Sequence, residues 1–174
     1  RKIEELKIDL KGFISASGIG YYGTITSETI FLETDKVGND FLADVCHKWE
    51  QAANQFSTKK TSVTILRTGI VLSKKGGALE KMKTQIITPL GSGKQYIPWI
   101  HIDDLCLLYI KALENNLEGI FNAVAPDNST SYSFSKTLAK SLKRPFLPLG
   151  VPGFILKLIF GEMAIILLNG SRVS

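Results

Sequence analysis

The length, composition and charge of the chain exclude several classes of protein. With 174 residues and 44% hydrophobic content it can build one domain with a core, but not two complete ones. Its net charge of +5 comes from scattered lysines rather than one basic tract, so no nucleic-acid partner is expected. Cys46 and Cys106 are too few for a disulfide framework and lack metal-ligand spacing. Each lies in an apolar helical pattern, which predicts buried, reduced thiols, no metal site and a cytoplasmic location.

The first part of the chain predicts a strand, a helix and a second strand. Arg1 is followed by the apolar residues Ile3 and Leu6, as if a segment were already under way, so we expect the chain to begin within a domain. An apolar run at residues 13–17 passes into small residues, as a buried parallel strand does where it reaches a site. A β-rich run at residues 62–66 follows the helix, so the three pieces predict a parallel βαβ unit.

The predicted helix between these strands starts at Asn39 or Asp40, either of which can serve as its N-cap. Apolar residues recur at helical spacing along it, and we expect them to form its buried face: Phe41, Leu42, Val45, Trp49, Ala52 and Phe56.

The rest of the chain continues to alternate helices and strands, which is typical of an α/β protein. The expected elements are a short helix over 78–86, a strand over 96–102, a helix capped by Asp103 with Leu105, Leu108, Ala112 and Leu113 on one face, a strand over 119–124, a polar turn over 128–133, and a helix carrying Phe134, Leu138 and Leu142. The apolar stretch 151–168 contains Lys157 and Glu162, so buried or partner-facing helices are expected there rather than a membrane span. A membrane-surface helix is the alternative.

Several stretches, in a fixed order and spacing, carry a resemblance to a known family. They are residues 15–23 (SASGIGYYG), 41–50 with the pair Trp49-Glu50, 66–79, 91–105 and 161–173. Together they resemble the extended, atypical short-chain dehydrogenases/reductases of the NAD-dependent epimerase/dehydratase family, in the subgroup commonly labelled "epimerase family protein". The resemblance covers nearly the whole chain.

This resemblance implies an α/β fold with part of a Rossmann-type doubly wound parallel sheet and a small C-terminal α/β domain on the substrate side. Residues 1–75 would be the C-terminal part of the NAD(P)-binding domain, whose N-terminal half is absent here. Residues 76–174 would form the substrate side, with 101–125 returning to the sheet. The implied cofactor is NADP or NAD, with NADP preferred, and its pyrophosphate-binding turn is expected to be missing from this chain. As an alternative, the spaced glycines of residues 18–23 match a phosphate loop by spelling, although two tyrosines would crowd the phosphates.

The resemblance also implies where a site should lie. Ser17 matches the serine that orients a substrate hydroxyl, with a simple hydrogen bond at the strand end as the alternative. Gly69 and Ile70 match positions whose backbone groups lie near the nicotinamide carboxamide, although Gly69 would also suit a turn. Ser15 and Ala16, on the strand before Ser17, are also expected to bind the cofactor. Ser17 and Gly69 are therefore expected at the tips of neighbouring parallel strands that open onto one crevice.

The family's acid/base pair is a tyrosine with a lysine four residues later, because a nearby cation brings the phenol pKa toward working pH. Those positions hold Leu42 and Cys46 in this sequence. Tyr21 or Tyr22 is a hypothetical replacement donor, while a ring packed under a loop is the plainer interpretation.

The resemblance places the substrate pocket near Gln95, Trp99 and His101. A structural hydrogen bond is the plainer interpretation of His101, and a core position is that of Trp99. Asp103 and Asp104 form a carboxylate pair, which helix capping explains.

These features predict an NAD(P)-dependent, epimerase/dehydratase-like oxidoreductase that acts on an unidentified sugar nucleotide or small hydroxyl or carbonyl compound. A homodimer is one expected assembly. The alternative function is a non-catalytic dinucleotide-binding or interaction protein that has lost the Tyr/Lys pair.

Overall fold

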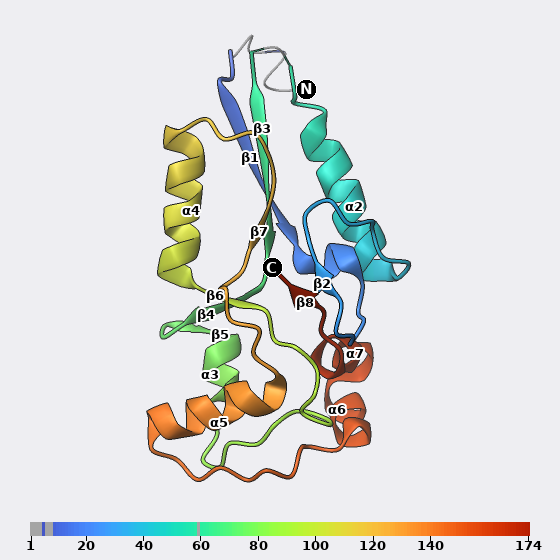
Figure 1. Cartoon of the computed structure of the whole chain (residues 1–174), viewed down its shortest axis with the longest axis vertical. Coiled ribbons are helices and arrows are strands. Elements are labelled where there is room, and N and C mark those ends of the chain that lie inside the picture. Colours follow the sequence, from blue (N-terminus) through green and yellow to red (C-terminus); the bar gives the residue numbers. More distant parts are fainter. Residues whose placement is uncertain (1–4, 6–8, 59) are drawn as a thin grey trace.

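The computed structural model describes residues 5, 9–58 and 60–174, and the predicted early segment with Ile3 and Leu6 lies outside them. At its centre is a parallel three-stranded sheet of β1 (Gly12–Gly18), β3 (Ser62–Thr68) and β7 (Gly119–Ala123), in that order (Figure 1). Ser17 lies opposite Arg67, and Arg67 opposite Asn122. The parallel βαβ unit is therefore confirmed, and the third strand joins the same sheet.

Helices cover both faces of this sheet. Helix α2 (Phe41–Asn54) lies on one face and α4 (Ile102–Glu114) on the other (Figure 1). Successive residues of β3 point to opposite faces. Val63 and Ile65 accordingly pack with Ala53 of α2, whereas Leu66 packs with Leu105 of α4. Both faces of β3 are thus buried, which is why its sequence is a continuous apolar run.

Helix α2 begins where its sequence predicts, but it buries a different face. Asp40 is the N-cap, and its carboxylate accepts a hydrogen bond from the Ala43 amide at 2.9 Å. The buried residues are Ala43, Cys46, Glu50 and Ala53. Phe41 and Trp49 of the predicted apolar face are exposed instead. Small side chains let the helix approach the sheet, and the partner of Glu50 described below makes its burial possible.

Helix α4 also departs from the prediction. Its N-cap is His101 rather than Asp103, and the His101 ring accepts from the Asp103 amide at 3.2 Å. Leu105 and Ala112 face the sheet, seven residues apart. Their immediate successors therefore turn outward, so Cys106 and Leu113 are exposed and the prediction of a buried thiol at Cys106 is wrong.

A second group of elements lies beyond the carboxyl ends of the strands. It contains a small sheet of β5 (Gly76–Gly77), β4 (Ile70–Ser73) and β6 (Trp99–His101), together with α3 (Ala78–Met82) and α5 (Ser131–Leu142). The helix expected over 78–86 and the strand expected over 96–102 are shorter than predicted. Helix α5 starts inside the predicted polar turn, because Thr130 and Ser133 form a reciprocal capping box.

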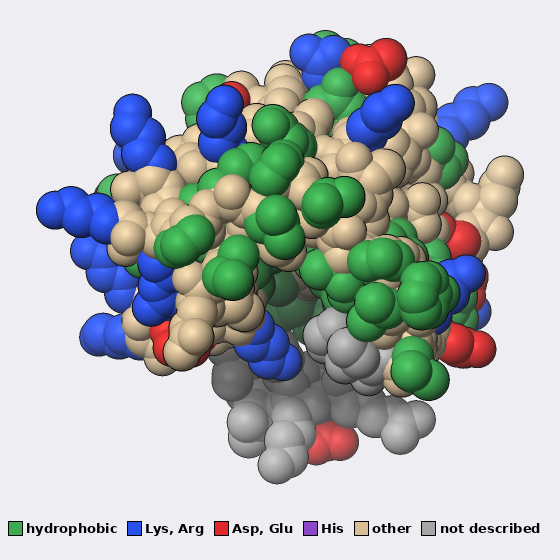
Figure 2. All heavy atoms as spheres, turned by 90° about the horizontal axis from the view of Figure 1, so that it is seen from below, with side chains coloured by type: hydrophobic (Ala, Val, Ile, Leu, Met, Phe, Trp, Pro, Cys, Tyr) green, Lys and Arg blue, Asp and Glu red, His purple; other side chains and the backbone are tan. Residues whose placement is uncertain are grey.

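The C-terminal segment returns toward the sheet. It runs through α6 (Gly153–Phe160), η2 (Gly161–Met163) and α7 (Ala164–Leu168) to β8 (Arg172–Val173), which pairs with β2 (Ile30–Phe31). Phe154 and Leu158 are exposed, so the expected burial of the apolar stretch is wrong at these two positions. Figure 2 shows hydrophobic side chains gathered on this end of the molecule among lysines and arginines. Across the residues described, none of the helices combines the length and apolar character needed to cross a bilayer.

Candidate functional site

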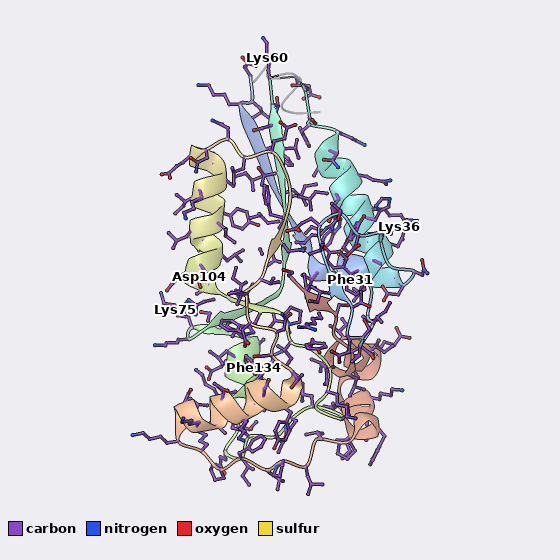
Figure 3. All side chains as sticks on the ribbon, viewed as in Figure 1. Phe31, Lys36, Lys60, Lys75, Asp104 and Phe134 are labelled. Atoms are coloured by element: carbon purple, nitrogen blue, oxygen red, sulfur yellow. The ribbon has the colours of Figure 1, made fainter. Side chains whose placement is uncertain are left out.

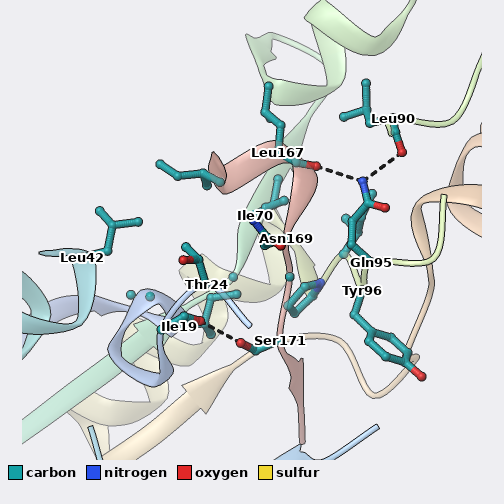
Figure 4. A pocket seen from close by; sticks show the side chains of 18 of the residues that line it. Ile19, Thr24, Leu42, Ile70, Leu90, Gln95, Tyr96, Leu167, Asn169 and Ser171 are labelled. Atoms are coloured by element: carbon teal, nitrogen blue, oxygen red, sulfur yellow. Dashed lines mark hydrogen bonds between the residues drawn. The ribbon is translucent and has the colours of Figure 1, made fainter. Parts of the chain in front are cut away.

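A cavity of about 230 Å³ opens at the carboxyl ends of β1 and β3. Its floor comes from Gly18, where β1 ends in η1 (Ile19–Tyr22), and from Thr68 to Ile70, where β3 passes into β4. The opposite wall comes from residues 95–98 and from the C-terminal residues 166–171 (Figure 4). The two strands therefore open onto one crevice that Gly69 lines, but Ser17, which was expected there as well, is not part of its lining.

Gly69 lines this cavity at a position where the neighbouring backbone leaves no room for a side chain. A Cβ atom there would lie 2.7 Å from the carbonyl oxygen of Pro98. The Gly69 amide donates to the Ala123 carbonyl at 3.1 Å, and the Ile70 amide donates to Pro98 at 2.8 Å. Close backbone approach thus gives the reason for the glycine, and the Ile70 side chain faces the cavity.

The other two predicted cofactor residues lie farther back along β1. Ser15 pairs with Ile65 and Ala16 with Leu66, and neither lines the cavity.

The Ser17 hydroxyl is bound inside the protein. It donates to Glu50 Oε1 at 2.8 Å, next to the site where Arg67 forms two bonds to the same carboxylate, at 2.8 and 2.9 Å. The Arg67 and Glu50 side chains are only 1% and 5% exposed. Burial lowers the pKa of Arg67, but its bonds to Glu50 and Tyr22 outweigh this and raise that pKa, so the guanidinium stays charged. Ser17 accordingly makes the strand-end hydrogen bond considered from sequence.

Sequence reasoning missed this buried pair, although it left a signal. Glu50 falls at helical spacing from Ala43 and Cys46, on the face that small residues mark as buried, and Arg67 ends an apolar strand. A charge on each of two facing buried surfaces indicates an ion pair.

Tyr21 and Tyr22 also contact this pair rather than the cavity. The Tyr22 hydroxyl donates to Asn122 Oδ1 at 2.7 Å and accepts from Arg67 at 3.0 Å, and its ring stacks on Phe31. Burial raises the pKa of Tyr22 against the lowering effect of Arg67. The Arg67 guanidinium lies 3.4 Å from the centre of the Tyr21 ring. Both rings are therefore packed into the protein.

Leu42 and Cys46, at the positions where the resemblance implies the acid/base pair, offer no group suited to that role. Leu42 presents its side chain to the cavity. Cys46 is buried beneath Gly18 and Gly20, and burial raises the pKa of its thiol.

Of the predicted substrate-pocket residues, the structure places Gln95 at the cavity. Its amide nitrogen donates to the carbonyl oxygens of Leu90 and Leu167 at 3.0 and 2.9 Å (Figure 4). These two bonds tie the C-terminal segment to the loop before β6. Trp99 and His101 lie on β6 away from the cavity, and Asp104 lies exposed near the start of α4 (Figure 3). In the described part of the chain no cluster of three or more His, Cys, Asp or Glu side chains could hold a metal ion.

A parallel sheet covered by helices on both faces, with a cavity at the strand ends, defines a Rossmann-type α/β protein. No family model matches the sequence. The chain is 42% identical over 167 residues to the epimerase family protein SDR39U1 homolog, chloroplastic, of Arabidopsis thaliana, covering 92% of this chain and 47% of that protein. It is 36% identical to human epimerase family protein SDR39U1, covering 94% of this chain and 57% of the relative.

Solved structures agree with these relatives. The crystal structure of human epimerase family protein SDR39U1 (isoform 2) with NADPH superposes with a TM-score of 0.86 at 35% identity, covering 94% of this chain and 57% of that one. A nucleoside-diphosphate sugar epimerase from Corynebacterium glutamicum gives 0.72 at 30% identity, covering 94% and 32%. The chain belongs to the epimerase family of extended short-chain dehydrogenases/reductases. It spans about half the length of the curated relatives it matches.

Proposed function

We propose that the protein containing this chain binds NADP(H) or NAD(H) and acts as an epimerase/dehydratase-like oxidoreductase on a compound with a hydroxyl or carbonyl group. One observation carries the proposal: the tips of β1 and β3 open onto a single cavity, in a chain 35% identical to a human protein solved with NADPH. NADPH in that structure also favours NADP(H) over NAD(H).

The residues at the strand tips fit the nicotinamide end of such a cofactor. Gly18 and Gly69 bring no side chain to the cavity floor, and Ile70 offers an apolar surface. A flat ring with one carboxamide suits a floor of this kind, whereas the pyrophosphate would need donors from outside this chain. When bound, the nicotinamide accepts or supplies a hydride. Leu42 and Ile70 would exclude water from the reacting end.

A non-catalytic dinucleotide-binding protein is the second candidate, and a specific observation favours it. Leu42 and Cys46 replace the acid/base pair, while the hydroxyls of Ser17 and Tyr22 are both donated to partners within the protein. Turnover of hydroxyl or carbonyl compounds by the full-length protein separates the two candidates, since the second predicts cofactor binding without turnover.

Cofactor binding is tested by titrating the full-length protein with NADPH and following its fluorescence. Ile70→Arg places a bulky cation in the cavity floor and should weaken binding at least about tenfold, which is about 1.4 kcal/mol. Ser73→Arg, on the same strand but outside the cavity, should leave it unchanged. Failure of the unmodified protein to bind either NADPH or NADH would refute the proposal.

A homodimer and a cytoplasmic location stay predictions. The Arabidopsis relative is named as chloroplastic. A small-molecule substrate is part of the proposal above.

A further inference from the structure

We propose that the cavity takes an uncharged, mainly apolar alcohol or carbonyl compound, and not a nucleotide sugar. The inference rests on the proposed function, because it names the substrate class for the same site. Three features of the cavity carry it: the side chains in its wall, the state of its polar groups and the charges nearby.

The wall of the cavity is apolar. Apart from glycines, most of the residues lining it are hydrophobic: Ile19, Leu42, Ile70, Met82, Leu90, Ile97, Pro98, Ile166 and Leu167. No Lys, Arg, His, Asp or Glu belongs to the lining that the described residues provide. Proteins recognise diphosphates with arginine, lysine or helix N-termini, and an uncompensated charge in an apolar site is costly. The wall that this chain builds therefore offers no group that binds the diphosphate of a nucleotide sugar.

Each polar side chain in the wall donates at least one hydrogen bond within the protein. Thr24 donates to Asp40, Thr68 to the Leu66 carbonyl, Tyr96 to Glu28, Asn169 to the Ile165 carbonyl, Ser171 to the Gly23 carbonyl, and Gln95 to Leu90 and Leu167. A sugar carries several hydroxyls, each of which needs a partner when buried. A wall with its donors occupied suits a ligand with few polar groups.

One polar atom of the wall lacks a partner. Gln95 Oε1 is buried and makes no hydrogen bond to any residue that the structure describes. The orientation of the amide is fixed, because its nitrogen faces two carbonyl oxygens. Because this oxygen is closed off from the cavity, it offers no hydrogen bond to the hydroxyls of a bound sugar.

Charge beside the cavity is also wrong for phosphate. An adjoining hollow shares Thr24, Leu42 and Ile166 with it, and the charged residues lining that hollow are Asp40 and Glu162. Two carboxylates repel a diphosphate that extends from the cavity in this direction. The part of the cavity that this chain builds, about 230 Å³, is also below the roughly 300–1,000 Å³ common for drug-sized ligands.

The test uses the full-length protein loaded with NADP⁺. Binding of cyclohexanol, cinnamyl alcohol and octanal is compared with binding of UDP-glucose and dTDP-glucose by saturation-transfer NMR and calorimetry. At least one apolar probe should bind ten times more tightly than either nucleotide sugar. Leu42→Lys, which adds a cation to the wall, should weaken that probe at least tenfold. Leu107→Lys is the matched control, since Leu107 is 53% exposed on α4 and lines no part of the cavity.

The outcomes separate this inference from the proposed function. If neither NADP⁺ nor NAD⁺ binds, the proposed function fails. If NADP⁺ binds but a nucleotide sugar binds more tightly than every apolar probe, or no apolar probe binds, the inference alone is overturned. The comparison of probes on the unmodified protein does not depend on whether Leu42→Lys folds.

Discussion

The buried ion pair between Glu50 and Arg67 gives a stability prediction with a clear magnitude. In Glu50→Gln the Arg67 guanidinium, 1% exposed, loses its counter-charge while staying buried. Breaking a buried pair by removing one partner costs about 3–5 kcal/mol, because an uncompensated charge remains. The Ser17 hydroxyl keeps an acceptor in the glutamine oxygen, so the loss reports the charge. We expect the free energy of unfolding of the full-length protein, measured in urea, to fall by about this amount.

A matched variant on the same helix provides the control. Asp44 pairs with Lys48 at 2.7 Å, but the two side chains are 54% and 67% exposed. Exposed pairs of this spacing contribute about 0.3–0.5 kcal/mol, so Asp44→Asn should be nearly neutral. Equal losses in the two variants would refute the assignment of Glu50 and Arg67 to a buried pair. Replacing both by leucine should recover much of the loss, because two apolar groups of similar shape leave no charge unpaired.

Three further predictions concern single side chains. Tyr22→Phe should destabilise the protein by about 1–3 kcal/mol, since Asn122 loses a donor, and should leave any turnover by the folded protein unchanged; a specific loss of turnover would restore Tyr22 as a proton donor. Cys106 is exposed and should react with iodoacetamide first, whereas Cys46, whose thiol pKa is raised by burial, should stay unmodified at pH ~8.5 until the protein unfolds; equal rates would contradict this. Burial raises the pKa of Asp40, but hydrogen bonds from Ala43 and Thr24 outweigh it and lower that pKa, so the contribution of Asp40 is present above about pH 4 and lost as pH falls through its folded pKa. Asp40→Ala should therefore cost about 1 kcal/mol at neutral pH and less in acid, and an equal cost in acid would argue against the cap.

Local patterns were sufficient for the central βαβ unit. The strand that ends at Gly18 follows from an apolar run, and the cap Asp40 follows from an acidic residue just before a helical pattern. Each of these signals spans only a few neighbouring residues. The place of Gly69 at the crevice came from the family resemblance, and the reason for the glycine, the approach of the Pro98 carbonyl, came only from the structure.

The other features depend on contacts between distant residues. Ser171 donates to the Gly23 carbonyl, 148 residues away in sequence, and this bond helps bring the C-terminal segment to the cavity wall. Glu50 can be buried because Arg67, on the neighbouring strand β3, binds its carboxylate. The apolar pattern of the sequence contains no sign of this partner, so it predicted that the wrong face of α2 is buried. No local pattern contains either partner.

Methyl NMR tests most directly where the cofactor binds. Full-length protein with isoleucine δ1 methyls labelled is titrated with NADPH. The account predicts that the signals of Ile19 and Ile70, at the strand tips, shift most, while that of Ile110, exposed on α4, stays in place. Shifts at Ile110 with Ile19 and Ile70 unchanged would show that NADPH binds elsewhere, and the central claim would be wrong.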